Sequence, residues 1–127
     1  MNNRLIKFRA WHKEGQSMLF AGDEFGTKHG LDCCRFAMEG QPVELMQFTG
    51  LHDKRGEEIY EGDIVKHTMP HTPYTERLSF LGKIEYVDVN CSFRTVSDYY
   101  GEEPIHEDIE LEVVGNIYEN PELLEEL

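Results

Sequence analysis

The sequence lacks the apolar segments that would place it in or across a membrane. None of its apolar runs approaches the roughly 18–20 residues that a transmembrane helix requires. Charged side chains interrupt the first 16 residues before an apolar stretch of the length found in secretory signals can form. These absences predict a cytoplasmic protein with no membrane partner.

Cysteine is scarce, and its placement disfavours both disulfides and zinc. The three cysteines are Cys33, Cys34 and Cys91. An odd count with one adjacent pair is a poor disulfide framework. The C-x₂-C spacing of a typical zinc site is absent. We therefore expect three ordinary reduced thiols and no bound metal.

Basic residues are missing from the C-terminal third. All 12 Lys and Arg lie at or before Arg94, whereas residues 95–127 hold 11 of the 25 acids. Residues 1–94 thus carry 14 acids and 12 bases, and the formal net charge of −13 arises mainly from the C-terminal third. This distribution disfavours binding to nucleic-acid phosphates, which requires a basic surface. It permits a basic protein partner, with nucleic-acid mimicry as the most specific form, or acids that serve only solubility.

The 127 residues are sufficient for one domain with a small appended subdomain. Hydrophobic residues make up 39% of the chain and aromatic residues 11%, enough for a real core. Short alternating segments separated by turn residues predict a mostly β protein with little α structure. We expect an N-terminal hairpin and extended subdomain over 1–44, and a β-barrel roll with an acidic C-terminal segment over 45–127.

The N-terminal segment predicts a hairpin. Residues 5–11 alternate, the "HKEGQ" sequence supplies a turn, and residues 17–20 return as a second strand. The two faces of the first strand carry Ile6, Phe8 and Ala10 on one side and Lys7, Arg9 and Trp11 on the other. Trp11 then shields the outer face or enters an interface, so it is a candidate for the partner surface. Residues 31–40 could form a short strand or one or two helical turns.

The stretch "TGLHDKRGEEIYEGDIV", residues 49–65, predicts turns rather than a ligand loop. Asp53 and Gly56 have the spacing of positions i and i+3 in a type I turn, and a second turn lies at Glu61-Gly62-Asp63. The glycines Gly50, Gly56 and Gly62 are six residues apart, which matches neither a P-loop nor a dinucleotide fingerprint. We expect Gly56 and Gly62 to be required for backbone conformation rather than for ligand binding.

The signals for an enzyme are weak, and we expect none. Five acids, Asp53, Glu57, Glu58, Glu61 and Asp63, could supply an acid and a base or oxygen ligands for a cation. Their spacing does not match an EF-hand loop, and acids beside Lys54 and Arg55 are typical of a solvated rim. Pro70 prevents the regular helix that would bring His67 and His71 to one metal. We therefore predict no catalytic residue, cofactor or metal.

The remaining chain predicts loops and further strands. Residues 66–80 and 98–108 have the character of loops, and residues 81–96 of a hairpin with a bulge or bend near Tyr86.

Residues 109–118 show the clearest strand pattern, with Ile109, Leu111 and Val113 inward and Glu110 and Glu112 outward. Repulsion between these two acids would be relieved by a basic partner, or by Lys83 and Arg94. Gly115, followed by Asn116, permits a bulge or tight turn. Asn120 and Pro121 then follow the pattern of a helix start.

Three blocks closely resemble the YopX family of phage and prophage proteins. They are "IKFRAWHKEGQSML", "TGLHDKRGEEIYEGDIV" and "IELEVVGNIYENPELL", and the resemblance extends from residue 5 to residue 124. The resemblance implies a C-terminal SH3-type β-barrel roll and a phage-related protein located in the cytoplasm of the host bacterium. It implies no catalytic residue, and the family's biochemical role is not established.

We therefore expect an accessory protein that acts by binding a host or phage protein. The candidate partner surface comprises Glu110, Glu112 and Trp11. Two alternatives stay open: a structural homo-oligomer subunit, and a small barrel that binds nucleic acid. The barrel alternative would use Lys7, Arg9, Trp11, Arg35 and Arg94.

Overall fold

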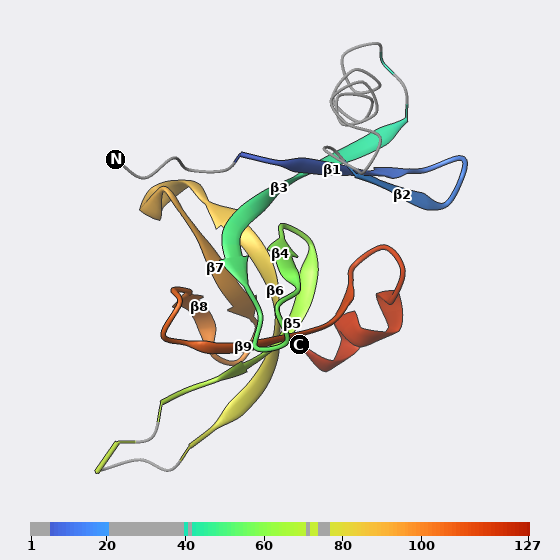
Figure 1. The fold of residues 1–127 in the computed structure, drawn as a ribbon. Helices are drawn as coiled ribbons and strands as arrows, with labels where there is room; N and C mark the ends of the chain where they lie inside the picture. The colour runs from blue at the N-terminus through green and yellow to red at the C-terminus, as the bar shows by residue number, and fades with distance from the viewer. Residues whose placement is uncertain (1–5, 21–39, 41, 71, 74–76) are drawn as a thin grey trace, which may run out of the picture. The chain divides into compact units, whose positions relative to one another are not determined.

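The computed structural model describes residues 6–20, 40, 42–70, 72–73 and 77–127. The chain forms two compact units, residues 1–50 and 51–127. Most of the regular structure is β-strand (Figure 1), which confirms the predicted mostly β class. Cys33, Cys34 and nearly all of the segment expected to be a short strand or helical turns lie outside the described residues.

The N-terminal strands form the predicted hairpin. Strands β1 (Phe8–His12) and β2 (Ser17–Phe20) pair antiparallel, with Trp11 opposite Met18. Strand β3 (Val43–His52) pairs with the other edge of β1, and the sheet has the order β2-β1-β3-β4, where β4 is Glu58–Tyr60. The boundary suggested by the sequence, between residues 44 and 45, lies inside β3.

Trp11, predicted to shield the outer face of the hairpin or to enter an interface, is buried. Arg9, Ala10 and Trp11 are all buried, and Trp11 is only 7% exposed, whereas Ile6 is 61% exposed. Consecutive residues of a strand point to opposite faces, so burial of all three means that both faces of β1 are covered here. The alternation rule assumes one solvated face and therefore fails for this strand. Trp11 offers no exposed surface to a partner.

The second unit is a curled antiparallel sheet of five strands with the order β8-β7-β6-β5-β9. Its strands are β5 (Asp63–Thr68), β6 (Ser79–Val87), β7 (Ser92–Ser97), β8 (Gly101–Pro104) and β9 (Glu110–Asn116). The sheet curls into a half-barrel (Figure 1), in agreement with the predicted barrel roll. A short 3₁₀ helix, η1 (Asp88–Asn90), joins β6 to β7, and η2 (Pro121–Glu126) is the predicted C-terminal helical turn.

The core of this unit confirms the predicted inward face of the last strand. Leu111 is buried with Ile59, Val65 and Ile84. The partly buried residues packed against this cluster are Leu51, Phe93, Ile105, Ile109 and Val113. Burying such aliphatic side chains is worth about 1.5–3 kcal/mol each. The strand at residues 110–116 is therefore an integral part of the core despite its acidic outer face.

The predicted loop over residues 66–80 is too long. Strands β5 and β6 extend into it from both ends, so the connection covers only residues 69–78. His67 pairs with Phe80, and Thr68 with Ser79 across the ladder. The proline-containing segment hides these pairs in the sequence, because pairing between β5 and β6 joins residues on either side of it.

Two further expectations are corrected. The register between β6 and β7 is continuous from Lys83 to Val87, so no bulge lies at Tyr86. The irregularity instead lies where β9 pairs with β5: Ile64 is opposite Gly115 and Val65 is opposite Val113. Residues 101–104, predicted as loop, form β8 because the edge of β7 supplies backbone partners for this acidic segment. Among the described residues, neither helical segment has the length and apolarity to cross a bilayer.

Candidate functional site

The turn at residues 53–57 is organised by the Asp53 side chain. The N–H of Gly56 donates to the carbonyl of Asp53 at 2.9 Å, as the predicted type I turn requires. The Oδ1 atom of Asp53 accepts hydrogen bonds from the N–H groups of Arg55 and Glu57, both at 2.9 Å. Its Oδ2 atom accepts another from the N–H of Val113 at 2.9 Å. Asp53 is therefore a buried structural acceptor and not part of a solvated rim.

These contacts determine the ionisation of Asp53. Burial acts to raise the pKa of its carboxyl group. The hydrogen bonds from Val113, Glu57 and Arg55, together with the positive charge of Arg55, outweigh burial and lower the pKa below its ordinary value. The carboxylate is held in its ionised form, which is poorly suited to general acid–base catalysis near neutral pH.

The same turn covers the free edge of strand β9. The N–H of Lys54 donates to the carbonyl of Leu111 at 2.9 Å, and Nη2 of Arg55 donates to the carbonyl of Val113 at 2.7 Å. With the Asp53–Val113 bond, these contacts take the place of a neighbouring strand. An exposed edge is a template for unwanted pairing, so the turn closes one side of the sheet. The contacts of this turn thus join it to the edge of the sheet.

The second turn of the block has a similar construction. The Oδ2 atom of Asp63, a buried residue, accepts a hydrogen bond from the N–H of Tyr60 at 2.8 Å. Gly62 donates to the carbonyl of Ile84 and accepts from the N–H of Ile117, both at 2.9 Å. The φ angles of Gly50, Gly56 and Gly62 are 91°, 88° and 85°. Positive φ at Gly56 and Gly62 is the conformation for which the sequence predicted glycine.

The end of β9 depends on close contact between Gly115 and Asn120. A Cβ atom added to Gly115 would lie 2.5 Å from Oδ1 of Asn120. That oxygen accepts the N–H of Asn116 at 3.1 Å, while Oδ1 of Asn116 accepts the N–H groups of Tyr118 and Glu119. Asn120 therefore does not cap η2 with its side chain, contrary to the predicted cap pattern, although Pro121 does begin that helix.

The two glutamates of the candidate partner surface already have basic partners within the chain. Glu110 forms an ion pair with Arg77, and Oε1 of Glu112 lies 3.3 Å from Nζ of Lys54. The sequence suggested Lys83 and Arg94, but those residues are on β6 and β7, and β5 separates β6 from β9. Lys83 instead pairs with Glu85 at 3.1 Å. Repulsion between Glu110 and Glu112 is thus relieved without an external partner.

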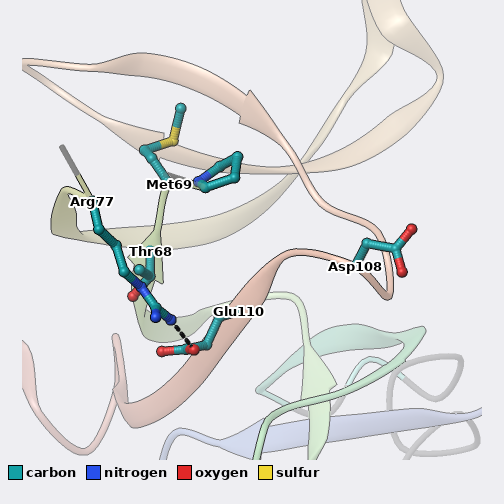
Figure 2. A pocket seen from close by; sticks show the side chains of 6 residues that line it. Thr68, Met69, Arg77, Asp108 and Glu110 are labelled. Carbon is teal, nitrogen blue, oxygen red and sulfur yellow. Dashed lines mark hydrogen bonds and ion pairs between the residues drawn. The ribbon is translucent and has the colours of Figure 1, made fainter. Parts of the chain in front are cut away.

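One pocket lies beside Glu110, and sequence reasoning missed most of its residues. It has a volume of about 260 Å³ and is lined by Thr68, Met69, Pro70, Arg77, Asp108 and Glu110. Figure 2 shows the Arg77–Glu110 pair next to Thr68, with Asp108 lying apart from them. The hydroxyl groups of Thr68 and Ser79 are hydrogen-bonded at 2.9 Å. Only the pairing of β5 with both β6 and β9 brings these segments together, so no local motif could have revealed the pocket.

A buried histidine, His67, lies on β5 two residues after the core residue Val65. His67 is 1% exposed, and its Nδ1 atom is 3.0 Å from Oγ1 of Thr95. Its ring stacks on Phe80, which stacks on Tyr100. Burial, followed by the charge of His106, lowers the pKa of His67. Across the described residues, no three His, Cys, Asp or Glu side chains are grouped so that they could hold a metal ion.

The described residues define a small antiparallel β protein whose sequence blocks stabilise turns and strand edges. A family model described as YopX protein matches residues 7–125, so the chain belongs to the YopX family. A similar solved structure is protein EF1440 from Enterococcus faecalis, with 28% identity and a TM-score of 0.58, covering 96% of this chain and 99% of that chain. No curated protein matches the sequence.

Proposed function

We propose that the chain is a phage or prophage accessory protein that acts in the host cytoplasm by binding a basic protein, without catalysis. The observation that supports this proposal is that most acids of the C-terminal third form no ion pair with a described base. Of the 11 acids in residues 95–127, Glu110 and Glu112 pair with a base. No ion pair to another described residue involves the other nine. A surface with this excess of unpaired negative charge attracts and orients positively charged partners.

Several of these acids lie in the segment between the end of β7 and the start of β9. Asp98, Glu102, Glu107 and Asp108 are all exposed on the β7–β8 turn, β8 and the β8–β9 connection. A charge at the rim of an interface changes mainly the association rate and its salt dependence. We therefore expect fast, salt-sensitive association with a basic partner.

The alternative of a nucleic-acid-binding barrel receives little support. Arg9 and Trp11, two of its proposed contacts, are buried, and Arg35 lies outside the described residues. Base stacking and phosphate contacts both require accessible side chains. A structural homo-oligomer remains the other alternative, and light scattering over a range of protein concentrations measures it directly.

A charge-matched pair of variants tests the proposal. Glu102→Gln with Glu107→Gln removes two negative charges from the acidic surface, whereas Glu14→Gln with Glu57→Gln removes two from exposed sites elsewhere. The probe is a peptide of alternating glycine and arginine, added to the full chain in calorimetric titrations. The first variant should bind it about 2- to 10-fold more weakly than the wild type, while the second should lose less. Equal weakening by both variants, or no binding by the wild type, would contradict the proposal.

A further inference from the structure

We propose that the pocket beside β9 receives an arginine side chain of the partner, and that the chain's own Arg77 competes for the same place. The pocket is lined by Thr68, Met69, Pro70, Arg77, Asp108 and Glu110. The inference rests on the proposed function, since it names the group by which a basic protein would be recognised.

The pocket has the chemistry that a guanidinium group requires. Glu110 provides a carboxylate that already pairs with a guanidinium, that of Arg77 (Figure 2). Arginine fits a carboxylate well because its planar donors can bind both oxygens. Met69 and Pro70 supply an apolar wall, against which the methylene groups of an incoming arginine can pack.

The charge in the pocket favours exchange of one cation for another. With Arg77 in place the lining carries one positive and two negative charges, so displacing Arg77 leaves Glu110 without its cation and the lining with a net charge of −2. Asp108 forms no ion pair with another described residue in the present arrangement. An anionic ligand would meet these two carboxylates, so the site disfavours phosphate or nucleic acid.

Arg77 can leave without a large penalty. Its side chain is 57% exposed and that of Glu110 is 40% exposed. An ion pair this accessible to water shifts an equilibrium by a factor of at most about five. After displacement, the guanidinium of Arg77 returns to solvent. The internal pair therefore behaves as a weak competitor that a partner arginine with additional contacts can replace.

Two variants that each lack one basic side chain distinguish competition by Arg77 from a general effect of charge. Arg77→Ala and Lys54→Ala each remove one positive charge and one ion pair with a glutamate of β9. The probe is the alternating glycine–arginine peptide, and its control contains citrulline in place of arginine. We expect Arg77→Ala to bind the arginine peptide about 2- to 5-fold more tightly than Lys54→Ala does, because Arg77 pairs with Glu110 of the pocket whereas Lys54 pairs with Glu112 outside it.

The complementary pair is Glu110→Gln and Glu112→Gln, which remove one charge each from the same strand. Glu110→Gln should bind several-fold more weakly than Glu112→Gln. In ¹H–¹⁵N spectra of the full chain, the arginine peptide should shift the amides of Met69, Arg77 and Glu110, and the citrulline peptide should not. The same spectra show whether each variant is folded. If Glu110→Gln does not fold, the comparison of Arg77→Ala with Lys54→Ala still tests the pocket.

The outcomes distinguish the pocket from the wider proposal. Equal affinities for Arg77→Ala and Lys54→Ala, with peptide-induced shifts elsewhere on the acidic surface, would overturn the pocket and leave a basic partner in place. Absence of arginine-peptide binding by both the wild type and Arg77→Ala would overturn the pocket and the basic partner together.

Discussion

The carboxylate of Asp53 accepts a hydrogen bond from the N–H of Val113, which lies 60 residues further along the chain, at 2.9 Å. This bond joins the turn at residues 53–57 to the middle of strand β9. The same carboxylate organises its own turn through the N–H groups of Arg55 and Glu57. The Asp53 side chain therefore contributes both to local turn formation and to closure of the sheet edge at β9.

Replacing Asp53 should destabilise the fold. Asp53→Ala leaves three backbone N–H groups without their acceptor, and we expect a loss of about 3 kcal/mol in the free energy of unfolding. Urea denaturation followed by circular dichroism measures the change. Glu57→Ala, in the same turn but exposed, is the control and should lose far less. Similar midpoints for the two variants would show that the carboxylate is dispensable.

Acid should act on the same contact. The pKa of Asp53 is lowered in the folded state, so its contribution is fully present above the ordinary value of 3.8. It is lost as the pH falls from about that value through the lower folded pKa, because the unfolded state then binds the proton more readily. Between pH 5 and pH 2 the wild type should lose more stability than Asp53→Asn. Parallel pH profiles for the two proteins would contradict this assignment.

His67 gives a second pH dependence at milder acidity. Its pKa is lowered by burial and then by the charge of His106, so the unfolded state protonates near 6.5 while the folded state resists. Stability should therefore fall as the pH drops below about 6.5, and the slope should be smaller in His67→Gln. An unchanged slope in His67→Gln would refute this role.

Local turn chemistry was predictable from the sequence, but long-range pairing was not. Gly56 and Gly62 were identified because turn residues act through their immediate neighbours. The partners of Glu110 and Glu112 depend on strand order, which places β5 rather than β6 beside β9. Strand β8 was missed because pairing with β7 outweighs the low strand preference of its glutamates. The pocket could not be found because three separated segments form it.

Gly115 should be required for a different reason from Gly56 and Gly62. An added Cβ would lie within 2.5 Å of Oδ1 of Asn120 and displace the hydrogen bond to the N–H of Asn116. We expect Gly115→Ala to cost about 1–2 kcal/mol in the free energy of unfolding.

Thermal or urea unfolding in a double-mutant cycle with Asn120→Ala tests that reason. The clash disappears when Asn120 is truncated. The double variant should therefore lose less stability than the sum of the losses in the two single variants. Full additivity would mean that Asn120 is not what Gly115 must avoid.

A direct comparison of two labelled probes tests our proposal that this acidic chain recognises a basic protein rather than nucleic acid. Fluorescence anisotropy at about 150 mM salt measures binding of the full chain to the alternating glycine–arginine peptide and to a short DNA duplex. We expect saturable, salt-sensitive binding of the peptide, and no DNA complex below about 100 μM, the weak end of non-specific DNA binding. A micromolar DNA complex that weakens steeply with salt, without peptide binding, would contradict this proposal.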